Sequence, residues 1–266
     1  MQTKINLFIY SILLVILVGC AGKKPEALSE SNQYYYQGKR AFENNKWIKA
    51  IDNLKLFLLN NPGSQVADSA QFLLGESYFN NEEYLMAISE YRQLTNKYSY
   101  SPLVEKGRYK IAKSYIELSP NYHLDQKNTR RAIRFCQSFI SNYPNSGYVD
   151  EIEKDIQRMR NKLAHKIYTN GVLYRKMQRW ESAEIYFNEL LAQYYDTKWT
   201  LDAKLEKAYC LIRMRKFNDY KQVIASLEDN YPKNKKVQND LVELEQDYKH
   251  EKDKMAKELK KREGRF

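Results

Sequence analysis

The feature that most constrains the fold of this chain is a small residue that recurs in pairs along it. In each pair, a Gly or Ala is followed about twelve positions later by a second small residue, and a Pro often ends the unit. Two antiparallel helices can approach closely only where both present small side chains, so this spacing predicts helix-turn-helix hairpins. Five units fit the pattern, with the marker residues Gly38, Ala50 and Pro62; Gly75 and Ala87; Ala112, Ala132 and Pro144; Gly171 and Ala183; and Ala208, Tyr220 and Pro232.

The register of these units is loose, but their number makes a chance match improbable. The third unit carries extra residues around 119–126, and Tyr220 stands where the last unit should have Ala. An aromatic residue three positions before the second small residue recurs in four units, and nine Gly and six Pro are too few to punctuate a many-stranded β fold. We therefore predict an all-α, tetratricopeptide-like α-solenoid of about five helix-turn-helix hairpins plus a C-terminal helix. The four aromatic residues are Trp47, Tyr84, Trp180 and Phe217.

Two further helices are predicted outside the hairpin pattern. Apolar residues recur at three- and four-residue spacing from Tyr148 to Ile167, which predicts a long amphipathic helix over about 147–170. A last helix over 235–262 has an apolar stripe that fades after Tyr248, so we expect its first half to cap the array and its second half to be solvated or frayed. The expected regions are hairpins 1–3 over 32–146, the connecting helix with hairpins 4–5 over 147–232, and a charged C-terminal helix over 233–266.

The N-terminal residues are typical of a lipoprotein signal peptide over 1–19. Lys4 supplies a positive charge, residues 5–18 form an apolar run, and Leu17-Val18-Gly19-Cys20 matches the lipobox pattern. The alternative, a transmembrane helix, needs about 20 apolar residues, more than this run supplies. We expect Cys20 to receive diacylglycerol and fatty chains such as palmitate, and residues 20–31 to be the lipidated Cys and its tether.

No residue pattern in the sequence indicates catalysis. His123, His165 and His250 lie at no metal-ligand spacing, and the nucleophile-elbow, phosphate-loop and dinucleotide-binding motifs do not occur. Cys136 and Cys210 stand in separate helical segments, where we expect buried free thiols. The net charge of +11 is spread along the chain, whereas a nucleic-acid binder more often concentrates it in a patch. We therefore predict a protein that is not an enzyme, holds no metal or cofactor, and binds other proteins but no nucleic acid.

One face of the predicted hairpins is a candidate for binding a peptide. In such arrays the first helix of each pair lines the concave face. The register places aromatic, charged and amide side chains there, which suits an extended peptide with an aromatic, carboxylate-bearing end. For Phe72 and Tyr109, packing between helices is an equally good interpretation. The predicted face comprises Tyr35, Lys39, Phe42, Phe72, Glu76, Phe79, Asn80, Tyr109, Lys113 and Ile116.

Several longer motifs resemble those of the BamD family, lipoproteins of the machinery that assembles β-barrel proteins in the outer membrane. The resemblance covers roughly residues 20–232, and its most specific part is the insertion in the third unit followed by a long helix. The motifs are the lipobox, Trp47-Ile48-Lys49-Ala50-Ile51, Ile111-Ala112-Lys113-Ser114-Tyr115, Leu118-Ser119-Pro120-Asn121-Tyr122-His123-Leu124-Asp125-Gln126, Ala132-Ile133, Asn142-Tyr143-Pro144-Asn145-Ser146-Gly147-Tyr148 and Arg179-Trp180.

The resemblance implies a lipid-anchored scaffold of the outer-membrane β-barrel assembly (BAM) complex that faces the periplasm. The first hairpins would bind unfolded outer-membrane protein precursors, and the last ones would dock on a POTRA domain of a barrel-shaped partner. The family's docking arginine in the fourth unit falls near Tyr186 here, so we expect that contact to differ. The tail beyond Lys233 is also longer and more charged than the family pattern.

Two other binding functions are compatible with such hairpins. A different periplasmic tetratricopeptide lipoprotein could coordinate envelope or peptidoglycan proteins. A glycan-capturing lipoprotein could use similar hairpins, although such proteins usually carry large inserted regions that this chain lacks. The proteins that bind this chain would distinguish these functions from the assembly scaffold. Only the assembly scaffold should be recovered with a large barrel protein that carries POTRA domains.

Overall fold

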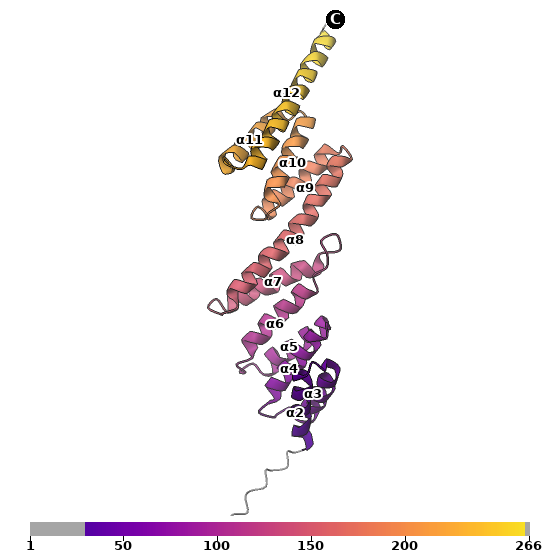
Figure 1. Cartoon of the computed structure of the whole chain (residues 1–266), viewed down its shortest axis with the longest axis vertical. Coiled ribbons are helices and arrows are strands. Elements are labelled where there is room, and N and C mark those ends of the chain that lie inside the picture. The colour runs from indigo at the N-terminus through magenta and orange to yellow at the C-terminus, as the bar shows by residue number, and fades with distance from the viewer. Residues whose placement is uncertain (1–29, 264–266) are drawn as a thin grey trace, which may run out of the picture. The chain divides into compact units, whose positions relative to one another are not determined.

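The computed structural model describes residues 30–263, which form eleven helices and no strand (Figure 1). The prediction of an all-α fold with five hairpins and a C-terminal helix is confirmed within these residues. The signal peptide and Cys20 lie outside them. The helices pair as α2 (Glu30–Glu43) with α3 (Trp47–Asn60), α4 (Ala67–Asn80) with α5 (Tyr84–Lys97), α6 (Val104–Glu117) with α7 (Lys127–Asn142), α8 (Val149–Lys176) with α9 (Trp180–Gln193) and α10 (Thr200–Arg213) with α11 (Phe217–Asn230), and α12 spans Lys235–Glu263.

The helices fall into two compact units, which we call unit 1 and unit 2. Unit 1 ends at Arg108 and unit 2 begins at Tyr109, so the division lies inside α6. The sequence-based grouping of hairpins 1–3 and hairpins 4–5 divides the repeats at a different place and stays a prediction. None of the described helices combines the length and the apolar character that crossing a membrane requires.

Small residues lie where the two helices of a hairpin touch, as the sequence spacing predicts. A Cβ atom added to Gly75 of α4 would come within 2.5 Å of the Tyr91 ring in α5. A Cβ atom at Gly171 of α8 would come equally close to the Phe187 ring in α9. Both rings are fully buried, so neither has open space into which it can move. Glycine at these positions lets an aromatic ring pack directly on the neighbouring helix backbone.

Four of the hairpins close with the same tight turn. In each turn, the residue two positions after the end of the first helix has a left-handed backbone, with φ between 57° and 62°. The next backbone N–H then donates to the carbonyl five residues back, over 2.9–3.0 Å. This is the Schellman arrangement that satisfies the last carbonyls of a helix. None of the four left-handed residues is a glycine, and they are Asn45, Glu82, Gln178 and Arg215.

The third hairpin replaces this turn with the insertion 118–126. Its centre is the side chain of Gln126, which is only 1% exposed. The Gln126 amide nitrogen donates to the carbonyls of Asn121 (2.7 Å) and Leu124 (3.0 Å), and its amide oxygen accepts from the Thr129 hydroxyl (2.7 Å). The Thr129 hydroxyl also lies 2.7 Å from the Ser119 hydroxyl. The insertion is therefore a folded element whose buried polar groups find partners inside the chain.

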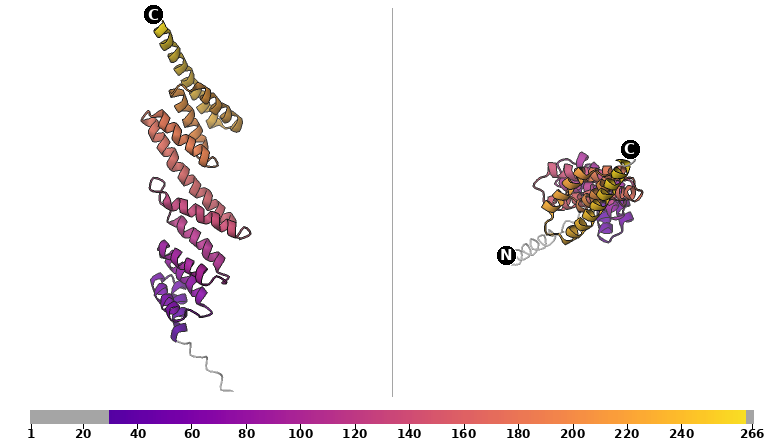
Figure 2. Two further views of the ribbon diagram at one scale, coloured as in Figure 1. Left: turned by 180° about the vertical axis from the view of Figure 1, so that it is seen from behind. Right: turned by 90° about the horizontal axis from the view of Figure 1, so that it is seen from above.

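The helix predicted over about 147–170 is α8, which continues to Lys176. It is both the connector and the first helix of the fourth hairpin, because no Pro interrupts it and Gly171 is held in the helix by its contact with Phe187. The helix packs against α7 and α9, and Figure 2 shows it running past both within unit 2.

The C-terminal helix α12 covers the last hairpin and ends at Glu263, one residue beyond the predicted end. Tyr220, which stands in place of the expected Ala, is 2% exposed and stacks on Tyr248 of α12, with 5.0 Å between ring centroids. Beyond Tyr248, Arg215 forms ion pairs with Glu251 (2.9 Å) and Glu258 (2.8 Å). The half beyond Tyr248 is largely exposed, as expected of a solvated segment, but it is helical to Glu263, and these ion pairs tie it to the turn of the fifth hairpin.

The prediction of buried free thiols is confirmed for Cys136 and Cys210. Burial in each case raises the pKa of the thiol to about 12. Both thiols are therefore inert packing groups at neutral pH.

Candidate functional site

The predicted peptide-binding residues of α2 are fixed to α3 by their rings. Tyr35 packs against Phe57 with 5.4 Å between ring centroids, and Phe42 packs against Trp47 at 5.3 Å. The Tyr35 and Phe42 side chains are half-buried, whereas Lys39, which lies between them on α2, is exposed. This part of unit 1 presents a cation flanked by the edges of two anchored aromatic residues.

The predicted residues of α4 are anchored in the same way, and one of them belongs to the core. Phe72 is 7% exposed and has the Lys106 ammonium 4.9 Å from its ring centroid. The Glu76 carboxylate accepts a hydrogen bond from the buried Tyr91 hydroxyl, and Phe79 is half-buried on the same helix. Asn80 is exposed. Unit 1 therefore brings its seven predicted residues together on two adjacent first helices, with Lys39 and Asn80 facing water.

Two of the three predicted residues of α6, Tyr109 and Lys113, contact α8 within unit 2. Tyr109 is 9% exposed and stacks on Tyr148 at 4.2 Å, and its hydroxyl donates to the Glu151 carboxylate over 2.9 Å. The Lys113 ammonium is 2.9 Å from Glu151 and 2.7 Å from Asp155. Burial lowers the pKa of Lys113, but the hydrogen bonds to both carboxylates outweigh it and raise that pKa overall.

Burial separates the buried from the exposed members of the predicted face. Phe72, Tyr109 and Ile116, which is 4% exposed, pack between helices and do not form an open peptide-binding face. This is the alternative that the sequence left equally open for Phe72 and Tyr109. Lys113 serves as a bridge between α6 and α8, so the exposed part of the predicted face lies on α2 and α4.

The predicted docking residue Tyr186 lies on α9 in the fourth hairpin. Its ring is half-buried and stacks on Tyr174 of α8, with 5.2 Å between centroids and an interplanar angle of 18°. Burial and the neighbouring Tyr174 raise the pKa of Tyr186. Next to it, Ile185 is 66% exposed. An aromatic pair beside an exposed aliphatic side chain is a suitable docking surface for a protein.

A hollow of about 760 Å³ lies where the insertion 118–126, the middle of α8 and the loop between α9 and α10 meet. We call it the α8 hollow. Its size is in the range of sites that hold small ligands or short peptide segments. It is lined by Asn121, Tyr122, Lys154, Gln157, Arg158, Asn161, Lys162, His165, Lys198 and Trp199.

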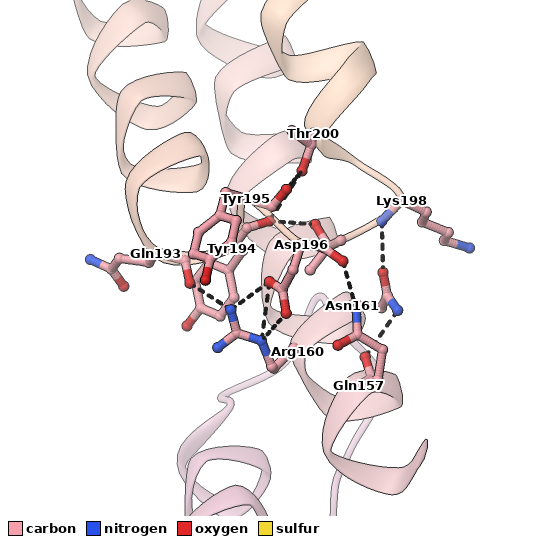
Figure 3. A network of polar contacts seen from close by, with 10 residues as sticks. Gln157, Arg160, Asn161, Gln193, Tyr194, Tyr195, Asp196, Lys198 and Thr200 are labelled. Carbon is pink, nitrogen blue, oxygen red and sulfur yellow. Dashed lines mark hydrogen bonds and ion pairs between the residues drawn. The ribbon is translucent and has the colours of Figure 1, made fainter. Parts of the chain in front are cut away.

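The loop that forms one wall of the α8 hollow is fixed to α8 by a polar network (Figure 3). The Arg160 guanidinium donates to both carboxylate oxygens of Asp196, with a shortest distance of 2.5 Å, and to the carbonyl of Gln193 (2.9 Å). The Asn161 side-chain oxygen accepts from the backbone N–H of Lys198 (3.0 Å), and the Asn161 carbonyl accepts from the Trp199 indole N–H (3.1 Å). Lys198 and Trp199 are therefore held in place before any ligand arrives.

The insertion forms the opposite wall and is fixed to α8 by lysines and by ring stacking. The Lys162 ammonium donates to the Ser119 hydroxyl (2.8 Å), and the Lys166 ammonium donates to the Leu124 carbonyl (2.7 Å). The His165 ring lies between Tyr122 and Trp199, with centroid distances of 3.7 Å and 4.1 Å. Burial, and then the Lys198 ammonium, lower the pKa of His165, so its imidazole is neutral at pH 7.

The sequence carries only part of the signal for the α8 hollow. Lys154, Arg158 and Lys162 follow each other at four-residue spacing, which places three cations on one face of a helix. The contributions of Tyr122 and Trp199 could not be read in this way, because those residues lie far from α8 in sequence.

A second, smaller hollow of about 350 Å³ in unit 2 has the opposite charge. It lies between α8, α10 and α12, and five carboxylate residues line it: Asp202, Glu206, Asp240, Glu243 and Asp247. Ion pairs of 2.6 Å from Arg175 to Glu206 and 2.7 Å from Lys236 to Asp202 neutralise part of this charge. Among the described residues, no three His, Cys, Asp or Glu side chains are placed to hold a metal ion.

Comparison with known proteins identifies a family and several relatives. The model of the family described as "YfiO: Outer membrane lipoprotein" matches residues 28–227. A protein of Caulobacter vibrioides named outer membrane protein assembly factor BamD is 24% identical over 223 residues, which cover 81% of this chain and 72% of that protein. The protein of the same name from Rickettsia prowazekii is 24% identical over 232 residues, which cover 85% and 92% of the two chains.

Among solved structures, the TPR domain of P58(IPK) is similar at a TM-score of 0.42 and 15% identity. The similarity covers 84% of this chain and 60% of that one. It is too low to add to the fold assignment, which rests on the helices described above.

Proposed function

We propose that this chain, which belongs to the YfiO family of outer membrane lipoproteins, is a non-enzymatic scaffold for the assembly of outer-membrane proteins. The match of the family model over 28–227 carries this proposal, and relatives named as outer membrane protein assembly factors support it. The hairpin fold also supports it, because stacked helix pairs offer extended surfaces to other proteins.

Lipid attachment at Cys20 would hold the scaffold at the outer membrane, facing the periplasm. The lipobox residues Leu17 to Cys20 support this part of the proposal. Substitution Cys20→Ala removes the acylated thiol, so we expect a soluble periplasmic form in cell fractionation. Continued recovery of the variant with the membrane would contradict acylation at this residue.

Unfolded barrel precursors would bind unit 1 across α2 and α4. The support is the exposed Lys39 and Asn80 beside the anchored rings of Tyr35, Phe42 and Phe79. Rigid aromatic edges bind an extended peptide with little loss of side-chain entropy, and the cation favours a carboxylate.

A POTRA domain of the barrel-shaped partner would dock on the fourth hairpin. The support is the stacked pair Tyr174 and Tyr186 with the exposed Ile185 beside it. Aromatic pairs fixed by a neighbouring helix are typical anchors of protein interfaces. An aromatic contact of this kind would replace the contact of the docking arginine in family members that carry it there.

Site-specific photo-crosslinking in living cells tests both surfaces. A photoreactive phenylalanine at Lys39 or Asn80 should capture barrel precursors, and one at Ile185 should capture a large POTRA-bearing barrel protein. Matched controls are Lys49 on α3 and Lys221 on α11, which are exposed on second helices of the two units. Equal capture of one partner from test and control positions would contradict the assignment of surfaces. Capture of peptidoglycan synthases alone would instead support a coordinator of peptidoglycan proteins.

A further inference from the structure

The α8 hollow carries a charge that the proposed assembly function does not use. Lys154, Arg158, Lys162 and Lys198 line it, and none of its lining residues is an Asp or Glu. Arg158 is paired with Asp155 (2.6 Å), and Lys162 is bonded to the neutral Ser119 hydroxyl. Within the part of the chain that the structure describes, Lys154 and Lys198 have no ion-pair partner and both are exposed. The hollow therefore attracts anions.

The spacing of the cations indicates what shape of anion fits. Lys154, Arg158 and Lys162 are separated by four residues on α8, so they follow each other at about 6 Å and span about 12 Å. Alternate residues of an extended peptide are about 7 Å apart and point to the same side. A peptide with a carboxylate at every second position therefore matches the row of cations, whereas a single phosphate would reach only one or two of them.

The aromatic wall adds a second element of recognition at one end of this row. Trp199 and Tyr122 flank the neutral His165 ring, one helical turn beyond Lys162. The Arg160 network and the Asn161 hydrogen bonds hold this wall in position (Figure 3). Rings that are fixed beforehand bind a further ring without an ordering cost. The Trp199 ring is also contacted by the Tyr168 ring (5.1 Å) and by the Lys198 ammonium (5.2 Å), so an aromatic side chain after the last carboxylate would rest against the exposed edge of this wall.

We propose that the α8 hollow binds an extended acidic segment of a partner protein, with carboxylates at alternate positions followed by an aromatic residue. Carboxylates of the segment pair with the row of Lys154, Arg158 and Lys162, the nearby Lys198 adds to the attraction, and the aromatic ring packs against Trp199. The site is separate from the α2 and α4 surface and from the Tyr186 surface. Its occupation does not depend on the proposed role in assembly, since it follows from the charge and geometry of unit 2 alone.

Fluorescence anisotropy with the purified full chain in detergent tests this site. The probe is a labelled peptide with Glu at its first, third and fifth positions, Ser between them, and Tyr followed by a C-terminal amide. We expect binding that falls about tenfold when Gln replaces each Glu of the peptide, and about tenfold in the double variant Lys154→Gln, Lys198→Gln. The control variant Lys221→Gln, Lys235→Gln loses the same charge at exposed positions outside the hollow, and should bind as the unchanged chain does.

Three results would overturn the proposal. The first is equal affinity of the Glu and Gln peptides, or an equal loss of affinity in the test and control variants. The second is stronger displacement of the peptide by inorganic phosphate than by chloride at the same ionic strength, which would assign the hollow to a single phosphate group. The third is binding to phosphatidylglycerol vesicles that is lost in the Lys154→Gln, Lys198→Gln variant while peptide binding is retained, which would assign it to a membrane surface. Because both lysines are exposed, the variants should keep the fold, and thermal melting checks this.

Discussion

Four hairpins of this chain close with a tight left-handed turn, and the third closes with an insertion that folds onto the next helix. The tight turns satisfy the end of a helix mainly with backbone hydrogen bonds, and they accept Asn45, Glu82, Gln178 or Arg215 at the strained position. The insertion satisfies its own carbonyls through Gln126 and through lysines of α8. A tight turn therefore only reverses the chain, whereas the insertion also builds a wall of the α8 hollow.

This difference shows how a repeat protein can gain a local site while its packing stays the same. The inter-helix contacts of the third hairpin use the same kinds of side chain as the others, with Ala112 and Ala132 fully buried. Only the connection changes. Substitutions in the connections and in the helix contacts should therefore change the free energy of unfolding independently of each other.

The largest effect is expected from Gln126→Ala. This substitution removes the three hydrogen bonds that the buried Gln126 side chain forms with the Asn121 carbonyl, the Leu124 carbonyl and the Thr129 hydroxyl, so at about 1 kcal/mol for each we expect a loss of about 3 kcal/mol in the free energy of unfolding. Urea denaturation followed by circular dichroism measures it. The neighbouring exposed Lys127 provides the control Lys127→Ala, which should change stability by less than about 0.5 kcal/mol. Equal stability of the two variants would mean that the insertion is not a folded element.

A smaller loss is expected from Gly171→Ala. The added Cβ meets the buried Phe187 ring, and the overpacking should exceed the gain in helix propensity, which leaves a net loss of about 1–2 kcal/mol. The control is Gly147→Ala in the same unit, where an added Cβ meets no atom within 4 Å. If Gly171→Ala were instead more stable than the unchanged protein, the close helix contact would not be present in solution.

A gain in stability is expected from Glu82→Gly. Glycine adopts a positive φ without strain, so the tight turn of the second hairpin should become more stable by about 1 kcal/mol. Glu82→Ala removes the same side chain without relieving the strain, and it should be close to neutral. Both values come from thermal unfolding, and a destabilising Glu82→Gly would contradict the left-handed conformation.

The smallest effect is expected from Glu90→Gln, and it depends on pH. Glu90 lies buried against Gln71, with 2.6 Å between its carboxylate and the Gln71 amide nitrogen. Burial raises the pKa of Glu90 above its usual value of 4.5, so the folded state holds this proton more tightly than the unfolded state.

The carboxyl therefore costs stability as the pH rises above 4.5, and the cost is complete once the pH exceeds the raised pKa. We expect Glu90→Gln to stabilise the protein at pH 7 by up to about 1 kcal/mol, and the gain to shrink toward pH 4. The same change at the exposed Glu82, Glu82→Gln, is the control. A constant difference between pH 4 and pH 7 would contradict the raised pKa.

The packing of this fold could be predicted from the sequence, because small residues such as Gly75 and Gly171 are the only ones that fit at a close helix contact. The tight turns could not be predicted, since Asn45, Glu82, Gln178 and Arg215 share no residue type and the backbone hydrogen bonds that hold them are independent of side chains.

The candidate sites, too, could be predicted from the sequence only in part. Helical register predicts which side chains share one face of the first helices, but register alone does not reveal that Phe72, Tyr109 and Ile116 are buried. The α8 hollow needs residues from three separate segments, and only the row of cations on α8 was visible in the sequence.

Partner identity tests the central claim, a scaffold for outer-membrane protein assembly, most directly. The full chain, extracted from native membranes in mild detergent and isolated through a C-terminal tag, is analysed by quantitative mass spectrometry. The account predicts a large β-barrel protein with POTRA domains in amounts comparable to the chain itself. Recovery of peptidoglycan synthases without any such barrel protein would contradict it.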